Sequence, residues 1–167
     1  MRVRLVTIPL LALLVVFESA VLSRMPLLHG TADVVLLFII AWSLQERVQT
    51  AWPENLAGGM MMGFISAYNV LIPLLAYLAV GALARYARRR VWQLTIVMMF
   101  ALTFIGTLLL HSLAAATRIV GGTPLPLGEA FRVVTLPALV LNLLLAAPVY
   151  ALVRDLADWL LPEEVEI

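Results

Sequence analysis

Four strongly polar side chains interrupt the apolar runs of this sequence, and a fifth stands at the start of one. They are Glu18, Asn69, His111 and Asn142, with Asp33 at the start of its run. A charged group in hydrocarbon costs about 2.5 to 3.5 kcal/mol on insertion scales, so each needs a partner or a function. Glu18 and His111 lie at similar depth, and they either pair or reach water separately. A catalytic pair is disfavoured because no nucleophile, metal-ligand spacing or phosphate-binding glycine loop accompanies them.

The sequence therefore predicts no catalytic residue, no metal site, no cofactor and no enzymatic activity. The chain has no cysteine, which excludes disulfides, thiolate metal sites and thiol nucleophiles. Asn142, with Pro148 after it, is expected to form interhelical hydrogen bonds of about 0.6 to 2 kcal/mol, with a binding role as the alternative.

Small residues four apart indicate close helix packing. Gly59 and Gly63 form a small-xxx-small motif that Ala67 continues. Such motifs are frequent in membrane helices, so this one fits packing within the chain as well as packing against another chain.

One dense basic patch follows the fourth apolar run. Arg85, Arg88, Arg89 and Arg90 precede Trp92. Each arginine near an anionic lipid surface contributes about 1 kcal/mol of attraction, so the patch predicts contact with anionic lipids and a role in fixing topology. Nucleic-acid binding is not expected of so small a patch beside a bilayer.

The elements that must position these residues are membrane-spanning helices. The chain is 63% hydrophobic and 13% charged, whereas a soluble domain carries about 25% charged residues. About 20 apolar residues are needed for each helical crossing. The 167 residues therefore fit five or six spans and no soluble domain.

We expect one all-α bundle over residues 1-161, with a short acidic cytoplasmic tail at 162-167. Asn69 and Pro73 divide a long apolar run into two short helices. The six expected spans are about 5-22, 28-44, 55-68, 70-85, 93-116 and 132-153. A removed signal peptide is the competing interpretation of the first span.

Arginine distribution sets the expected orientation. In a six-span arrangement three arginines lie on one side, namely Arg24, Arg118 and Arg132. The other eight lie on the opposite side, namely Arg2, Arg4, Arg47, Arg85, Arg88, Arg89, Arg90 and Arg154. The positive-inside rule then puts both termini and the basic patch in the cytoplasm.

Several segments together resemble the MreD family of bacterial rod shape-determining membrane proteins. They are Asp33-Val34-Val35-Leu36-Leu37, the Gly59 and Gly63 pair, Leu75 to Gly81 before the arginines, Asn142 with Pro148 and Tyr150, and Glu18-Ser19. The sequence departs from the family at Thr31-Ala32, where a proline is missing. It also departs at Ala67, which replaces a common acidic residue.

The resemblance implies a non-enzymatic scaffold in the bacterial inner membrane. Its implied partner is an MreC-like protein, which connects it to the RodA polymerase and a class B penicillin-binding protein. We expect partner contact through the Gly59 to Gly63 region and the outer surface of the first two spans. The family's helices are arranged as in the substrate-binding S-component of energy-coupling-factor vitamin transporters, which is the alternative function.

Overall fold

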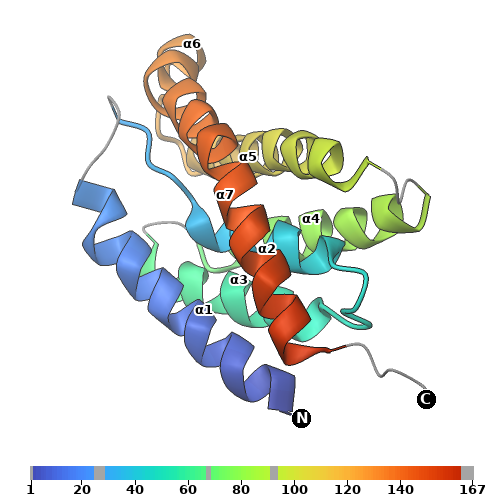
Figure 1. Ribbon diagram of the computed structural model, residues 1–167. Helices are drawn as coiled ribbons and strands as arrows, with labels where there is room; N and C mark the ends of the chain where they lie inside the picture. The colour runs from blue at the N-terminus through green and yellow to red at the C-terminus, as the bar shows by residue number, and fades with distance from the viewer. Residues whose placement is uncertain (1, 25–28, 67–68, 91–93, 163–167) are drawn as a thin grey trace, which may run out of the picture.

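The computed structural model describes residues 2–24, 29–66, 69–90 and 94–162, which are almost entirely helical and contain no β-strand (Figure 1). The all-α prediction is confirmed for this part of the chain. The long helices are α1 (Arg2–Ala20), α4 (Leu71–Arg90), α5 (Thr95–Val120) and α7 (Leu136–Leu160). The shorter elements are the 3₁₀ turn η1 (Leu22–Arg24), α2 (Val34–Leu44), α3 (Trp52–Ile65), α6 (Leu127–Ala130) and the π-helical turn η3 (Phe131–Thr135).

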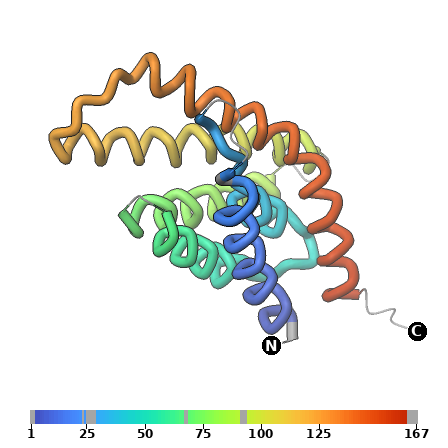
Figure 2. The backbone as a smooth tube through the Cα atoms, turned by 90° about the vertical axis from the view of Figure 1, so that its left-hand side faces the viewer, coloured from blue at the N-terminus to red at the C-terminus, as the bar shows by residue number. Residues whose placement is uncertain are grey.

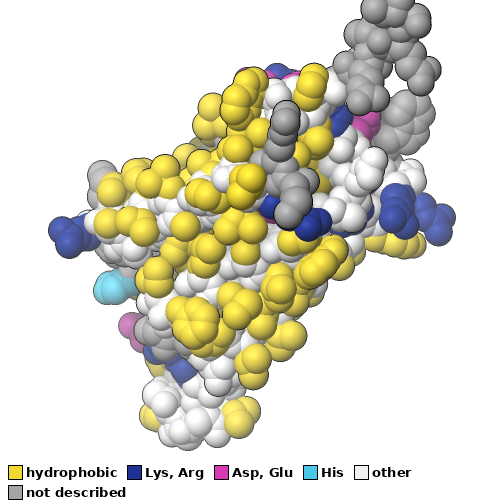
Figure 3. All heavy atoms as spheres, turned by 90° about the horizontal axis from the view of Figure 1, so that it is seen from below, with side chains coloured by type: hydrophobic (Ala, Val, Ile, Leu, Met, Phe, Trp, Pro, Cys, Tyr) yellow, Lys and Arg dark blue, Asp and Glu magenta, His cyan; other side chains and the backbone are white. Residues whose placement is uncertain are grey.

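Four helical stretches are long and apolar enough to cross a membrane. They are Val3–Ala20, Leu71–Arg90, Thr95–Val120 and the combined run Leu127–Leu160. The apolar α2 has only 11 residues, so it is about 16 Å long against a hydrocarbon layer of about 30 Å. Hydrophobic side chains also cover much of the face seen in Figure 3. The chain thus has the helix lengths and surface of a multi-pass membrane protein.

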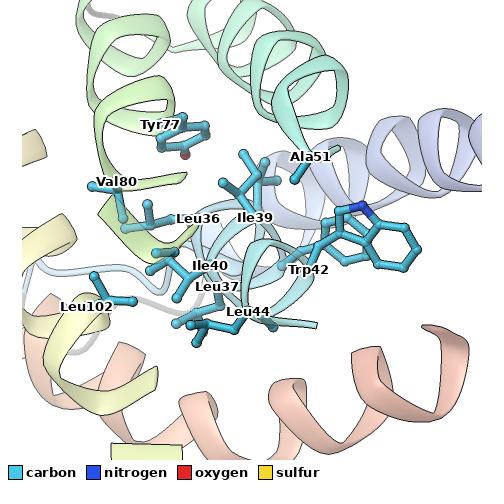
Figure 4. Close-up of a cluster of buried hydrophobic side chains, with 14 of the residues drawn as sticks. Leu36, Leu37, Ile39, Ile40, Trp42, Leu44, Ala51, Tyr77, Val80 and Leu102 are labelled. Atoms are coloured by element: carbon cyan, nitrogen blue, oxygen red, sulfur yellow. The ribbon is translucent and has the colours of Figure 1, made fainter. Parts of the chain in front are cut away.

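The core of the molecule is built around α2. Every residue from Val35 to Leu44 is buried. A helix that is apolar on all sides needs neighbours all round, and α1, α3, α4, α5 and α7 all contact α2. Figure 1 shows α7 crossing in front of α2 and α1 lying along one edge of the molecule. Tyr77 and Leu102 contribute to the same cluster from α4 and α5 (Figure 4).

The two ends of the described chain meet at one end of the bundle. Val3 and Arg4 at the start of α1 line the same pocket as Leu161, which follows α7. The loop between α2 and α3 lines this pocket too, and Arg85 of α4 reaches the loop at the Val48 carbonyl. We call this the arginine-rich end. Figure 2 shows both ends of the chain on this side, while the α5 and α6 ends project away.

Several helix boundaries differ from the expected spans. The basic patch was expected in a loop after residue 85, but α4 continues through Arg90. The expected break near Asn69 and Pro73 does separate two helices, α3 and α4, and Pro73 itself lies in the first turn of α4, where no intrahelical amide is needed. Pro53 similarly starts α3 at Trp52, three residues earlier than expected. The second helix begins only at Val34, because Asp33 caps it.

A tight junction joins the segment before α2 to the start of α7. Pro137 has no amide hydrogen, so the carbonyl of Val133 loses its usual helical donor. The His29 amide donates to that carbonyl over 3.2 Å. Gly30 lies directly against this turn: a Cβ there would be 2.5 Å from the Ala138 nitrogen. These contacts fix the segment that leads into α2 to the start of α7, at the opposite end of the bundle from the arginine-rich end.

Candidate functional site

Asp33 is the centre of a buried polar network at the start of α2. Its carboxylate accepts a hydrogen bond from the Leu36 amide at 2.7 Å, as an N-cap does. The hydroxyl of Tyr77 on α4 donates to both carboxylate oxygens, at 2.8 and 2.7 Å. Asp33 is 8% exposed and Tyr77 is fully buried. This carboxylate therefore holds α4 to the first turn of α2.

Glu18 reaches the same helix end from α1. Its carboxylate accepts from the Val35 amide at 3.2 Å. The first amides of a helix have no partner within the helix and carry partial positive charge. The backbone of α2 thus supplies hydrogen-bond donors to both carboxyl groups.

Asn142 continues the network into α5 and α7. Its side-chain oxygen accepts from the Asp33 amide at 2.8 Å, and its nitrogen donates to the Thr107 hydroxyl at 3.0 Å. Asn142 and Thr107 are both 1% exposed. The amide expected to hold helices together therefore connects α7 to both α5 and the entry of α2. The network as a whole joins α1, α2, α4, α5 and α7.

A pocket of about 530 Å³ opens beside this network, and we call it the acidic pocket. Its walls come from α1, α3, α4, α5 and the segments around them. Its polar lining residues are Glu18, Ser19, His29, Thr31, Asp33, Ser66, Tyr77 and His111. The Ser66 hydroxyl is buried and has no hydrogen-bond partner in the described part of the chain. The arrangement can accept cationic or hydrogen-bonding groups.

Glu18 and His111 share this pocket but do not bond each other. The Nδ1 atom of His111 lies 3.1 Å from the Thr135 hydroxyl, next to the π-helical turn. Glu18 is bonded to α2. Of the two interpretations left open by the sequence, the direct pair is therefore not formed. Among the described residues no three His, Asp or Glu side chains gather as a metal site.

Gly59 and Gly63 serve packing inside the chain. A Cβ on Gly59 would lie 2.8 Å from the Leu74 Cα, and one on Gly63 would lie 2.9 Å from the Val70 Cα. Small residues let two helix backbones approach closely, and here they bring α3 against the start of α4. The glycine pair is therefore covered by this chain and is not open to a partner.

The remaining predicted site residues have local roles or none. Asn69 is exposed, and its side chain accepts from the Leu71 amide at 3.0 Å, which caps α4. Pro148 is exposed on α7. Ala67 lies outside the described residues.

The basic patch divides into two pairs. Arg85 and Arg88 are partly buried and donate to carbonyls of the loop between α2 and α3, which include those of Val48 and Gln45. Arg89 and Arg90 are exposed. The guanidinium of Arg90 lies 5.7 Å from the ring centre of Tyr86. Half of the patch thus holds a loop, and half faces outward.

Comparison of the chain with protein-family models, with curated proteins and with solved structures finds no match.

Sequence reasoning missed three buried side chains that the structure makes prominent. Tyr77 appeared to be an ordinary residue of an apolar run, and nothing in its spacing indicated that it binds Asp33. Trp42 lies near the end of the second expected span and is 1% exposed. Glu54 lies one residue before the third expected span, which was expected to begin at residue 55. Pro followed by an acidic residue is typical of a helix start, and this signal would have placed Glu54 in the first turn of α3.

Proposed function

We propose that this chain is a non-enzymatic membrane scaffold of the bacterial rod-shape peptidoglycan synthesis complex. The observation that carries the proposal is that the polar network around Asp33 is used to join the chain's own helices while an apolar face of α1 stays open. Asp33, Glu18 and Asn142 hold five helices together through the first turn of α2. A rigid bundle with an unoccupied helix face suits the binding of another protein's transmembrane helix.

One open apolar face belongs to α1, while α5 and α7 also expose apolar side chains. Leu5, Leu13, Val16 and Phe17 are between 45 and 75% exposed and, with Pro9, follow one side of the helix. The other surfaces expected to bind a partner are used within the chain, since α2 is buried and Gly63 packs on α4. We therefore assign the partner helix to α1.

The proposed topology has six crossings with both termini in the cytoplasm of the bacterial inner membrane. Four of the crossings are full-length helical stretches, and the short helices α2 and α3, with 11 and 14 residues, would make the other two inside the bundle. Three arginines support it, because Arg4, Arg47 and Arg88 all lie at the arginine-rich end beside the loop between α2 and α3. The positive-inside rule assigns such an end to the cytoplasm. Arg89 and Arg90 would there contact anionic lipids.

Two substitutions on α1 test the proposed partner. The chain is co-expressed with the MreC-like protein of the same organism, which links it to RodA and the class B penicillin-binding protein. Leu13→Trp combined with Val16→Trp keeps the helix apolar but blocks close approach of a second helix. We expect recovery of the partner to fall at least about tenfold, which corresponds to about 1.4 kcal/mol.

Leu152→Trp on α7 is the matched control, because Leu152 is 70% exposed on a different helix. Recovery of the MreC-like protein with this variant should equal that of the wild type. Equal recovery with the α1 variant would contradict the assigned face. Absence of the MreC-like protein from the wild-type preparation would contradict the proposed function.

A second candidate function is supported by the acidic pocket. Its volume of about 530 Å³ suits a small molecule, and the unpartnered Ser66 hydroxyl is consistent with a bound ligand. The chain would then be the S-component of an energy-coupling-factor vitamin transporter. Native mass spectrometry separates the two functions, since the S-component would retain a vitamin and the scaffold would retain a protein.

A further inference from the structure

Glu54, in the first turn of α3, is a buried carboxylate with one oxygen unused. It is 2% exposed. Its Oε1 atom accepts from the Thr7 hydroxyl of α1 at 3.2 Å. Its Oε2 atom is buried and has no hydrogen-bond partner in the described ranges. A buried polar atom without a partner is costly, and more so when it is charged. This oxygen therefore calls for a hydrogen-bond donor.

Trp42, near the end of α2, has a hydrogen-bond donor without an acceptor. Its ring stacks on Phe38 with the centroids 5.9 Å apart. Its Nε1 atom is buried and lacks an acceptor among the residues that the structure describes. Figure 4 shows the indole at the edge of the aliphatic cluster, with its nitrogen turned away from Leu37 and Leu44. An indole nitrogen can only donate, so this atom calls for an acceptor.

Both side chains line one pocket of about 380 Å³ at the arginine-rich end, which we call the Glu54 pocket. Its other lining residues are Val3, Arg4, Arg47, Val48, Gln49, Thr50 and Leu161. Arg47 helps to build the wall, since it pairs with Asp158 at 3.2 Å and donates to the Leu161 carbonyl at 3.0 Å. Arg4 is exposed and has no hydrogen bond or ion pair with the described residues. The pocket thus contains a carboxylate oxygen that lacks a donor, an indole N–H that lacks an acceptor, and a guanidinium at its rim.

The position of the pocket narrows the choice of ligand. It lies where α1 begins and α7 ends, and both belong to stretches long enough to cross a membrane. The ends of such helices lie at the level of the lipid headgroups. A ligand at this level that carries both an ammonium group and a phosphate satisfies both needs at once.

We propose that the Glu54 pocket binds the headgroup of an aminophospholipid of the phosphatidylethanolamine class. The primary ammonium donates to Oε2 of Glu54. The phosphate accepts from Nε1 of Trp42 and pairs with Arg4. Val3 and Leu161 offer apolar contact to the glycerol end of the lipid. This site differs from the exposed Arg89 and Arg90, which attract any anionic lipid.

Native mass spectrometry of the full-length protein tests the proposal. The protein is equilibrated with equal amounts of phosphatidylethanolamine, phosphatidylcholine and phosphatidylglycerol that have the same acyl chains. Phosphatidylcholine has no N–H group, so it cannot donate to Glu54. A hydrogen bond to a charged group is stronger than one between neutral groups, so we expect retention of phosphatidylethanolamine on the order of tenfold above phosphatidylcholine.

Two near-isosteric variants separate the two contacts. Glu54→Gln keeps an acceptor for Thr7 but removes the charge, so it should remove the preference for phosphatidylethanolamine. Trp42→Phe keeps the stacked ring but removes the N–H that the phosphate accepts from, so it should lower retention of both lipids alike. Glu129→Gln is the control, because Glu129 is an exposed carboxylate on α6. The control should keep the wild-type preference. An unchanged preference in folded Glu54→Gln protein would overturn the proposal.

A series of lipids keeps the test independent of whether the variants fold. Wild-type protein is offered phosphatidylethanolamine and its mono-, di- and trimethylated forms. Retention should fall most at the trimethylated form, where the last N–H is lost. Equal retention of all four lipids in the series would overturn the proposal. A preference for phosphatidylglycerol would overturn it as well.

Discussion

Replacing Gly30 with alanine is expected to destabilise the folded protein by about 3 kcal/mol. The new Cβ would lie 2.5 Å from the Ala138 nitrogen, 2.6 Å from the Val134 carbonyl oxygen and 2.9 Å from the Pro137 Cβ. Two of these atoms are backbone, so a rotamer change cannot relieve the clash. Overpacking a tight site costs about 1 to 3 kcal/mol, and this position is at the upper limit. Separation of the two segments would also break the bond from His29 to Val133.

The measurement is the midpoint of unfolding in a detergent titration, followed by circular dichroism. Gly128→Ala is the matched control, because a Cβ on Gly128 meets no atom within 4 Å. It should unfold with the wild type or slightly later, since alanine favours the helical state. Equal midpoints for Gly30→Ala and the control would show that the junction between the α2 entry and α7 is not tight.

Asp33→Ala should be similarly destabilising, by about 2 to 5 kcal/mol. Loss of an N-cap costs about 0.5 to 2 kcal/mol, and a buried hydroxyl left without a partner costs about 1 to 3 kcal/mol. The substitution does both, because Asp33 accepts from the Leu36 amide and from the Tyr77 hydroxyl. The same unfolding titration measures the loss.

Two comparisons make this prediction specific. Asp33→Asn retains one acceptor oxygen for the cap and should lose less stability than Asp33→Ala. Asp155→Ala removes an exposed carboxylate whose partner is the neighbouring Arg154, so its effect should be below about 0.5 kcal/mol. If Asp33→Ala and Asp155→Ala unfolded together, the network around α2 would not contribute to stability.

The general architecture was predictable because hydrophobicity over long runs reports on membrane helices directly. The expected runs near α1, α5 and α7 correspond to stretches that can cross a membrane. The division of the third long run near Asn69 and Pro73 was also predictable, since α3 and α4 separate there. Exact boundaries were harder: Pro53 lies in the first turn of α3, which begins at Trp52 and not at residue 55.

The polar network was only partly predictable. Glu18, Asp33 and Asn142 stood out because each is costly in hydrocarbon. Their mutual contacts were not readable, because residues 17 and 109 positions apart meet only after the helices pack. Glu18 accepts from an amide in the first turn of α2 and does not pair with His111. No sequence pattern shows where the end of a helix will be buried.

The buried polar groups differ in whether the chain itself satisfies them. In Asp33 and Asn142 every described contact goes to this chain's own helices. Glu54 differs, because one of its oxygens has no such partner. A buried carboxylate therefore contributes to packing at Asp33, whereas at Glu54 one oxygen is left for the proposed ligand of the Glu54 pocket.

Both the proposed partner face and the proposed scaffold depend on the cytoplasmic position of the arginine-rich end. The chain has no cysteine, so single-cysteine variants can be labelled without background. The exposed positions Thr50 and Arg89 test the arginine-rich end, and exposed Thr123 tests the opposite end. Right-side-out vesicles that hold Thr50→Cys, Arg89→Cys or Thr123→Cys are treated with a membrane-impermeant maleimide.

We predict that Thr123→Cys reacts in sealed vesicles, whereas Thr50→Cys and Arg89→Cys react only after the vesicles are opened. Labelling of Arg89→Cys in sealed vesicles, or of Thr50→Cys and Arg89→Cys from opposite sides, would contradict the account.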